Sequence, residues 1–258
     1  MVVAFVTFSQ RRWTGGIRFI LDKFQAHLDP GPGAIVRSVD AKLDPRKVNV
    51  LLVSHSHPDH YGDAETFIEA MTEGTTKKKG TLVAPHSVLF GNDACEASIS
   101  KYHQRIIGRV IEAKPGDSFN IGELNVKATR AFHSDPEAVG YCLDIPEAGT
   151  VGYTSDTELF HGIQDYYEGV RLLILCVMRP SGSPWQGHMT SDDAVEIINL
   201  VRPEAAILTH FGLKMLMNSP EKQAKSVEER TGVPVKAAFD RMSVTLKNKE
   251  IFYARRNM

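Results

Sequence analysis

The chain has 258 residues, of which 42% are hydrophobic and 24% charged, and its formal net charge is −1. This is the composition of an ordinary globular protein that is long enough to bury a core. The charge balance argues against a general attraction to nucleic acid or to an anionic membrane. Three widely spaced cysteines without a CxxC pair argue against a secreted disulfide scaffold and indicate a reducing compartment.

The chain begins with "MVVAFVTFSQRRW", which is apolar for its first eight residues. It lacks a basic segment before the apolar run, so it is predicted to be a strand rather than a signal peptide. No apolar run approaches the ~18 residues of a membrane span, and no membrane association is expected. Together with the cysteine pattern, this predicts a cytoplasmic protein.

Further strands are predicted where short runs rich in Val, Ile, Leu and Tyr are bounded by Gly, Pro, Asp and Asn. In chain order these runs are 34–39, 49–54, 81–84, 124–132, 139–145, 150–155, 170–177, 205–210, 233–238 and 242–247. Several of them are apolar throughout, as expected of strands that are buried on both faces.

Helical spacing of apolar residues and suitable end residues predict helices over 63–74, 190–201 and 219–232. The segment "GTTKKKG" (74–80) between predicted elements indicates a basic loop. Strands in both halves with helices between them predict sheets packed against helical layers. Without a Pro-, Gly- or Ser-rich linker, a single domain over residues 1–258 is expected.

The stretch "SHSHPDHYGD" (54–63) crowds four metal-ligand residues into six positions, namely His55, His57, Asp59 and His60. They follow a predicted buried strand, at the end where sheets that carry helices place their ligand sites. Pro58 stops the strand and can start a helix, which separates the first two histidines from Asp59 and His60. This pattern favours two adjacent metal ions, with imidazole and carboxylate ligands.

Three other predicted strands also end in a ligand-type residue: His133 in "TRAFHSD", Asp156 in "VGYTSDTE" and His210 in "AAILTHFG". With the four residues of the HxHxDH stretch they make seven, the number that two metals need while a position stays open for water. A water between two metal ions loses a proton near neutral pH, so the set predicts metal-assisted hydrolysis by a bridging hydroxide.

These residues resemble those of the metallo-β-lactamase superfamily, over roughly residues 14–245. The resemblance implies an α/β fold, the four-layer αββα sandwich, with two mixed sheets flanked by helices. It implies that Asp29 in "HLDPGPG" (27–33) supports the metal loop. His55, His57 and His133 would hold one metal, Asp59, His60 and His210 the other, and Asp156 would bridge them. Zinc is the expected metal, with manganese and iron as alternatives.

Two branches of the superfamily depart from this pattern. Its true β-lactamases have Cys at the position of Asp156, which argues against lactam hydrolysis. Its diiron oxygen-reducing branch has Glu at the position of His57 and a following flavin domain, neither of which occurs here. Redox chemistry is therefore not expected.

The segment "GHMTSDDAVEIINLVRPEAAILTHFG" (187–212) resembles the closing region of the tRNase Z and cyclic phosphodiesterase branch. The resemblance implies that His188, outside the seven ligands, stabilises the transition state or protonates the leaving oxygen. His188 and Asp59 are thus the expected catalytic residues. The tRNA-gripping arm of tRNase Z has no room here, because only 22 residues, read as strand–turn–strand, separate His133 from Asp156.

The expected function is therefore hydrolysis of a small or cyclic phosphodiester or an RNA end. A thioester or lactone hydrolase with the same metals is the alternative, and a non-catalytic metal-binding protein of the same fold is a third reading. The expected partner is a small-molecule or nucleotide phosphodiester, with RNA bound without an arm as a second candidate, and a homodimer is left open. Arg179 and Trp185 could line the substrate mouth, and Lys77–Lys79 could contact phosphate but read first as a solvated loop.

Overall fold

A computed structural model describes residues 2–247 and 250–255 of the chain. These residues form two compact units. The smaller unit comprises residues 13–114 and 121–123, and the larger unit comprises the described parts of 1–12, 115–120 and 124–255. Each unit is described by itself, and the single domain expected over 1–258 stays a prediction.

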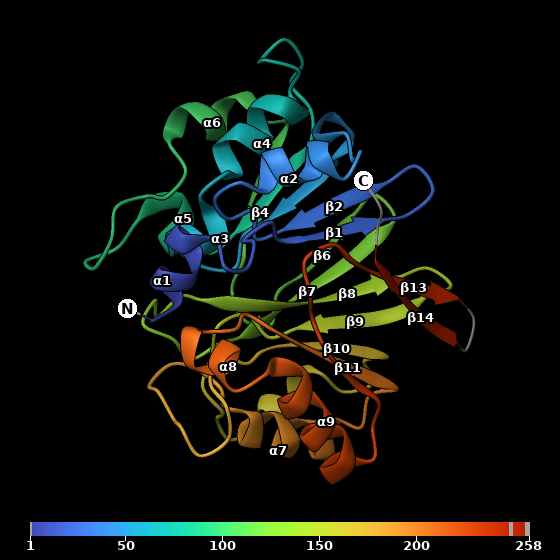
Figure 1. Cartoon of the computed structure of the whole chain (residues 1–258). Coiled ribbons are helices and arrows are strands. Elements are labelled where there is room, and N and C mark those ends of the chain that lie inside the picture. The colour runs from blue at the N-terminus through green and yellow to red at the C-terminus, as the bar shows by residue number, and fades with distance from the viewer. Residues whose placement is uncertain (1, 248–249, 256–258) are drawn as a thin grey trace. The chain divides into compact units, whose positions relative to one another are not determined.

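The smaller unit is built on a five-stranded sheet with helices packed on it (Figure 1). Its strands, in spatial and chain order, are β1 (Ile17–Ile20), β2 (Gln25–Leu28), β3 (Val50–Leu52), β4 (Thr81–Ala84) and β5 (Arg109–Glu112). β1 and β2 form an antiparallel pair, and the other neighbours are parallel. Its helices are α2 (Ala34–Asp40), η1 (Pro45–Lys47), α3 (Pro58–Tyr61), α4 (Ala64–Met71), α5 (His86–Phe90) and α6 (Lys101–Ile106).

The core of the smaller unit lies between β3, β4 and the apolar face of α4. Leu51 and Leu82 from the strands pack with Phe67, Ile68 and Met71 from the helix, and all five side chains are fully buried. The strand predicted at 81–84 is therefore confirmed with the same bounds, and the strand predicted at 49–54 and the helix predicted at 63–74 are confirmed with shorter ends.

The strand predicted at 34–39 is wrong, because these residues form helix α2. Gly33 precedes the helix with a positive φ of 87°, a conformation that glycine adopts without strain. Ala34 and Ser38 are buried whereas Val36 between them is 54% exposed. A strand would bury all three on one face, so the spacing is helical, and the Ile–Val content of the segment misled the prediction.

The strand predicted at the N-terminus is also wrong, because Val2–Ser9 form helix α1 of the larger unit. Val6 is buried in this helix, while Phe8 is 71% exposed. The β propensity of valine and phenylalanine is a weak preference that packing overrides. Met1 lies outside the described residues.

The larger unit is built on a seven-stranded mixed sheet in the order β12-β11-β10-β9-β8-β7-β6. These strands are β6 (Ser118–Ile121), β7 (Leu124–Arg130), β8 (Val139–Ile145), β9 (Gly149–Tyr153), β10 (Leu172–Cys176), β11 (Ala205–Thr209) and β12 (Val235–Ala237). The unit also contains η2 (Ile163–Tyr166), α7 (Ser191–Val201), α8 (Leu213–Met217), α9 (Pro220–Thr231) and the hairpin of β13 (Met242–Lys247) with β14 (Glu250–Arg255).

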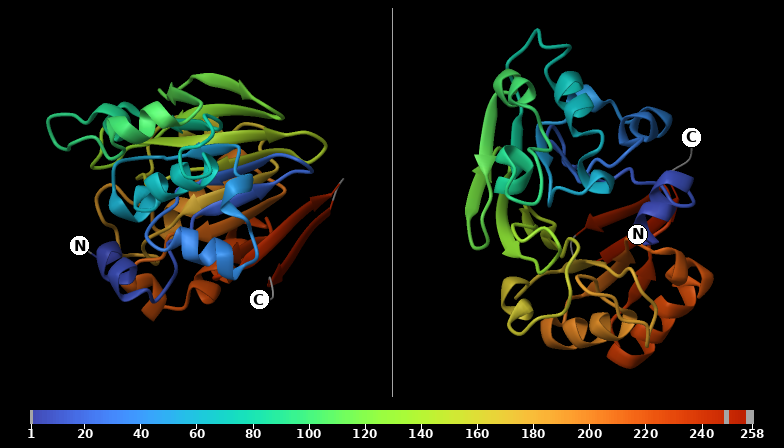
Figure 2. Two further views of the ribbon diagram at one scale, coloured as in Figure 1. Left: turned by 90° about the horizontal axis from the view of Figure 1, so that it is seen from above. Right: turned by 90° about the vertical axis from the view of Figure 1, so that its left-hand side faces the viewer.

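Helices α7 and α9 cover one face of this sheet (Figures 1 and 2). Ile197 and Ile198 of α7 and Val227 of α9 are fully buried in one cluster with Leu173 and Leu208 of the sheet. Both helices are capped as their sequences indicate. Thr190 and Asp193 form a reciprocal capping box at the start of α7, and Gly232 ends α9 with a left-handed φ of 70°.

The chain between His133 and Asp156 is a tight antiparallel pair, as predicted. β8 and β9 are in register from Tyr141 opposite Tyr153 to Ile145 opposite Gly149, so residues 146–148 alone connect them. All of this segment is described, and it contains no inserted arm. Cys142 on β8 is a free, buried thiol, and burial raises its pKa to about 12, so it stays protonated and unreactive.

The remaining predicted strands of the larger unit are confirmed within a few residues at each end. Strands β1, β2, β5, β6 and β14 and the short helices α5, α6 and α8 had no clear sequence signal. None of the helices in the described parts of the chain has the length and apolarity needed to cross a membrane. The cytoplasmic location stays a prediction.

A buried polar network ties β1 to β2. The Nε of Arg18 donates to Nδ1 of His27 at 2.9 Å, and Nε2 of His27 contacts the carbonyl of Gly15 at 2.9 Å. Because Nδ1 accepts, Nε2 must carry the proton, and His27 is the neutral tautomer. Burial and the neighbouring Arg18 guanidinium hold the pKa of His27 well below 6.5, and burial lowers that of Arg18 to about 10.

We predict that His27 makes the protein acid-sensitive. Below pH 6.5 the unfolded chain takes up a proton at this histidine that the folded chain does not, so stability falls as the pH falls, by up to about 1.4 kcal/mol per pH unit. His27→Gln keeps a donor and an acceptor but does not titrate. Urea unfolding at pH 7.5 and 5.5 should show a smaller loss for His27→Gln than for the wild type. His161→Gln, at an exposed histidine, serves as control, and an unchanged loss in His27→Gln would refute the assignment.

Candidate metal centre

The histidines of "SHSHPDHYGD" follow the carboxyl end of β3 in the smaller unit, as predicted. β3 ends at Leu52, and Pro58 occupies the first position of α3. The helix therefore begins between His57 and Asp59, and it places Asp59 and His60 in its first turn. His55 and His60 are buried, and their ring centroids lie 4.1 Å apart.

The buried carboxylate of Asp29 holds this loop. It accepts hydrogen bonds from the backbone N–H and the hydroxyl of Ser54, both at 2.7 Å, and from Nδ1 of His60 at 2.8 Å. The expectation that Asp29 supports the metal loop therefore has a physical basis: one carboxylate fixes both the end of β3 and a ring of α3. Asp29 itself has a positive φ of 51°, and the surrounding hydrogen bonds hold it in this strained conformation.

These hydrogen bonds also set the protonation of two rings. The Ser54 hydroxyl donates to Asp29, so its oxygen accepts from Nδ1 of His55 at 2.9 Å. His60 donates from Nδ1 to the same carboxylate. Nε2 of both His55 and His60 is consequently left with a lone pair, which is the state that a metal ion requires.

The spacing of the first two histidines suits a shared cation. Nε2 of His55 and Nδ1 of His57 lie 3.1 Å apart. Two nitrogens bound tetrahedrally to zinc are about 3.3 Å apart, given Zn–N distances of about 2.0–2.1 Å. The smaller unit thus provides two imidazoles whose spacing fits one metal ion. Asp59 and His60 follow one helical turn later, and Nε2 of His60 lies 3.8 Å from the Asp59 carboxylate.

In the larger unit, three imidazoles converge on the carboxylate of Asp156, which follows β9. Oδ2 of Asp156 lies 3.2 Å from Nε2 of His210, 3.9 Å from Nε2 of His133 and 3.6 Å from Nδ1 of His188. The two predicted ligands and the predicted acid thus surround the one carboxylate. The ligand atoms of His133, Asp156 and His188 lie within 4.8 Å of one another, a spacing that could hold a metal ion.

Gly187 fixes the ring of His133. Nδ1 of His133 donates to the Gly187 carbonyl at 2.8 Å, which leaves a lone pair on Nε2. Gly187 has a φ of 75°, and a Cβ added to it would lie 3.0 Å from that same Nδ1. The backbone therefore approaches the ring more closely than a larger residue would allow. Glu158 holds this loop in turn, because its carboxylate accepts from the N–H of Gly187 at 3.0 Å.

The loop that ends at His188 is itself anchored. Arg179 is buried, donates from Nε to the carbonyl of Ser183 at 2.9 Å, and lies over the ring of Trp185 with its Cζ 5.3 Å from the centroid. Trp185 is 47% exposed, and its carbonyl accepts from the N–H of His188. Arg179 therefore holds the loop in shape, whereas Trp185 is the exposed residue of the two.

The structure brings the predicted site residues together in two clusters: His55, His57, Asp59 and His60 in the smaller unit, and His133, Asp156, His188 and His210 in the larger unit. Within each cluster the donors are nitrogen and oxygen, a set that suits zinc, manganese and iron. The residues present therefore fit divalent metal ions.

Sequence reasoning missed three residues that orient these rings. Ser54 and Glu158 stand inside the stretches that drew attention to the ligands, and Gly187 directly precedes His188. Ser, Glu and Gly are residue types that can orient a neighbouring ring. The sequence does not show which ring each one orients, because their hydrogen-bond partners lie 25 to 54 residues away in the chain. Cys95 is also close to the loop, with its Sγ 3.4 Å from the hydroxyl of Ser56, 39 residues away in sequence.

Histidines and carboxylates that follow the strands of two mixed sheets are typical of a metal-binding α/β protein. Comparison with known proteins identifies the family. Residues 26–211 match the model of the β-lactamase superfamily domain, so the chain belongs to this family. It is 39% identical over 96% of its length to the uncharacterized protein MJ1374 of Methanocaldococcus jannaschii, covering 92% of that protein. It is 32% identical over 71% of its length to a metal-dependent hydrolase of Aeropyrum pernix, covering 74% of that protein.

Solved structures confirm the predicted fold class, the αββα sandwich. The metallo-β-lactamase fold protein YhfI from Bacillus subtilis matches with a TM-score of 0.70 at 16% identity, over 92% of this chain and 90% of that one. The short form of human tRNase Z matches with a TM-score of 0.63 at 17% identity, over 89% of this chain and 91% of that one. At these identities the likeness is one of fold.

We predict that Gly187→Ala loses metal while the fold survives. The added methyl group would meet Nδ1 of His133 at 3.0 Å and turn that ring away from its hydrogen bond. Gly182→Ala is the matched control, because Gly182 also has a positive φ, 65°, but open space around it. After zinc loading, mass spectrometry should find at least about tenfold weaker retention of metal in Gly187→Ala than in Gly182→Ala. Equal retention would show that the contact does not position the ring.

Proposed function

We propose that the chain hydrolyses a small or cyclic phosphodiester, or the phosphodiester at an RNA end, with the help of two divalent metal ions. The coarser statement follows from its family and relatives: the chain is a metal-dependent hydrolase of the metallo-β-lactamase fold. The phosphodiester, the two metals and the roles of individual residues are the proposal, and the arrangement around Asp156 carries it.

The proposed ligands are the seven residues predicted from the sequence. As the resemblance implies, His55, His57 and His133 would hold one ion, Asp59, His60 and His210 would hold the other, and Asp156 would serve both. Zinc is the proposed metal because the donors are mainly imidazoles and because hydrogen bonds to Asp29, Ser54 and Gly187 leave lone pairs on the metal-facing nitrogens. Bound metals would lower the pKa of a water molecule and offset negative charge on the phosphoryl group.

His188 is the observation that points to a phosphodiester. Its ring stacks on that of His210, with the planes 17° apart and the centroids 6.0 Å apart, and contacts that of His133 edge-on at 4.8 Å. It is therefore a titratable side chain beside the proposed ligands but not among them. Its Nδ1 faces the Asp156 carboxylate at 3.6 Å, so Nε2 is the atom that can give a proton to a leaving oxygen.

The segment between His133 and Asp156 supports a small substrate. β8 and β9 are joined by residues 146–148 alone, so this part of the chain offers no arm to grip a folded RNA. Trp185, half exposed three residues before His188, offers an aromatic face for a base or another ring. A nucleotide phosphodiester fits these features, and the protein would bind it without a macromolecular partner.

We expect a hydrolysis screen on the zinc-loaded protein to find phosphodiesterase activity. The substrates are bis-p-nitrophenyl phosphate and 2′,3′-cyclic nucleotides, set against thioesters, lactones and a precursor tRNA. The same metals could serve acyl hydrolysis, so turnover of the acyl compounds alone would replace the proposed substrate class. A metal content well below one ion per chain, with no gain of activity on adding zinc or manganese, would instead indicate a binding protein.

We predict that His188→Ala lowers kcat on the phosphodiester by about 10²–10⁴-fold with metal content unchanged, because the leaving oxygen loses its proton donor. A more acidic leaving group needs less help, so p-nitrophenyl esters should lose less than alkyl esters. His161→Ala, at an exposed histidine of the same unit, should keep wild-type activity. A loss below threefold in His188→Ala on a confirmed substrate would eliminate this role.

A further inference from the structure

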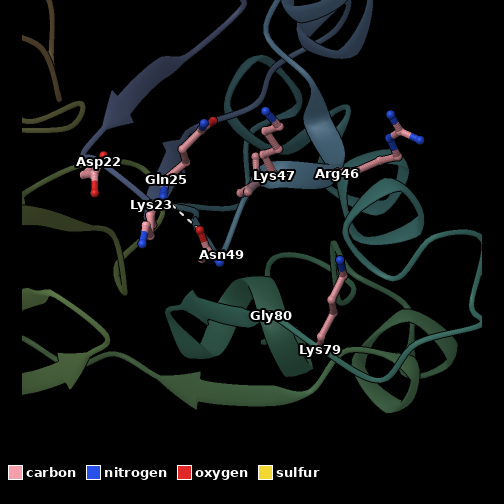
Figure 3. A pocket seen from close by; sticks show the side chains of 9 residues that line it. Asp22, Lys23, Gln25, Arg46, Lys47, Asn49, Lys79 and Gly80 are labelled. Carbon is pink, nitrogen blue, oxygen red and sulfur yellow. Dashed lines mark hydrogen bonds between the residues drawn. The ribbon is translucent and has the colours of Figure 1, made fainter.

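The smaller unit contains a concave site at the other end of its sheet from the histidines. A pocket of about 490 Å³ is lined by Asp22, Lys23, Gln25, Arg46, Lys47, Val48, Asn49, Lys79 and Gly80. Figure 3 shows the side chains that line the pocket. It also marks the hydrogen bond from the N–H of Gln25 to the side-chain oxygen of Asn49, which is 2.8 Å long. Pockets that bind small molecules measure roughly 300–1,000 Å³, so the volume suits a small ligand.

The pocket is separate from the metal cluster of the same unit. Val48 and Asn49 precede β3 and Gly80 precedes β4, so the pocket lies at the amino ends of two parallel strands. His55 follows the carboxyl end of β3. Since a strand rises about 3.3 Å per residue, the six residues from Asn49 to His55 can span up to about 20 Å.

Three segments of the chain each bring cations to this pocket. Lys23 comes from the turn between β1 and β2, Arg46 and Lys47 come from η1, and Lys79 comes from the basic loop 74–80. The floor is neutral, because Val48 is buried and Gln25 and Gly80 are half-buried, whereas the four cationic residues are exposed. The site thus has a neutral base and a positively charged rim.

Two of these cations form ion pairs in the described part of the chain and two do not. The Arg46 guanidinium pairs with Asp44 at 2.8 Å, and the Lys79 ammonium pairs with Glu73 at 2.8 Å. Within residues 2–247 and 250–255, the structure gives Lys23 and Lys47 no ion-pair partner. Asp22 is the one acidic residue of the lining, so the rim keeps a surplus of positive charge that an anion would offset.

We propose that this pocket binds a small anion with two or more phosphate groups. The cations come from three separate segments of the chain, and a chain of phosphates offers each of them a charged group, whereas a single phosphate offers one group to all. Each contact would be a charge-assisted hydrogen bond to a phosphate oxygen, for which lysine serves as a point charge. The site uses none of the residues of the metal centre, so the proposal is independent of the proposed activity.

Lysine footprinting on the full-length protein tests the proposal. The protein is acetylated with and without sodium triphosphate, at equal ionic strength set with sodium chloride, and each lysine is read by mass spectrometry. We expect acetylation of Lys23 and Lys47 to slow by about fivefold or more, and that of Lys78 and Lys101, which are exposed in the same unit outside the pocket, to stay the same. Equal slowing at all four would mean general screening, and none would mean no binding; either result overturns the proposal.

Affinity measurements then assign the site. The double variant Lys23→Ala/Lys47→Ala should bind triphosphate about tenfold or more weakly, and Lys78→Ala/Lys101→Ala, with the same change in charge, less than twofold more weakly. His57→Ala must leave the protection of Lys23 and Lys47 intact, since loss of protection would place the anion at the metal centre and refute the pocket. Equal affinity for ATP and triphosphate would assign recognition to the phosphates alone, and tighter binding of ATP would add a contact to the nucleoside.

Discussion

The metal loop of the smaller unit depends on one buried carboxylate. Asp29 accepts from a backbone N–H, a hydroxyl and an imidazole, so its charge is matched by three donors within 2.8 Å. A buried carboxylate that lost these donors would be costly, and the native geometry therefore holds the donors in place. Because Ser54 relays the carboxylate to Nδ1 of His55, the same charge fixes the tautomers of two rings that lie 31 and 26 residues away from it in the chain.

The larger unit orients its histidine rings with a backbone carbonyl group and with strained turns. Nδ1 of His133 donates to Gly187, and Ser155 and His210 take positive φ angles of 58° and 61°. These conformations cost energy for residues with a side chain, and they persist because the flanking strands β9, β10 and β11 over-determine the chain. The turn at Ser155 places Asp156 after β9, and the turn at His210 brings Nε2 of His210 within 3.2 Å of Oδ2 of Asp156. Residues 54 positions apart in the chain therefore meet at neighbouring strand ends.

Much of this could be predicted from the sequence, and the failures have physical causes. Long apolar runs such as 170–177 predict their strands well, because a strand that is buried on both faces has apolar residues at nearly every position. β1 and β2 escaped detection because they are four residues long and carry the polar residues Arg18 and His27, which hydrogen-bond to each other across the strands. The HxHxDH motif could be recognised because its ligand-type residues lie within six consecutive positions, and such residues rarely cluster without a function. The partners Ser54 and Gly187 were not, because an orienting hydrogen bond across 25 or 54 residues leaves no periodic signal in a single chain.

The residues proposed to hold metals and the loop proposed to meet the substrate are separated in the chain. The proposed ligands sit at strand ends, whereas Trp185 and His188 lie on a loop that Arg179, Glu158 and Asp192 hold from its two sides. Asp192 of α7 accepts from the Ser181 hydroxyl and the N–H of Gly182, both at 2.9 Å. Arg230 of α9 donates to Asp192 at 2.7 Å, which lowers the pKa of that carboxyl and keeps it ionised as an acceptor. Under the proposed function, changes between Ser181 and Trp185 would alter the loop beside His188, while the hydrogen bonds that orient His60 and His133 come from Asp29 and Gly187. The proposed substrate choice therefore depends on this loop more than on the proposed ligands.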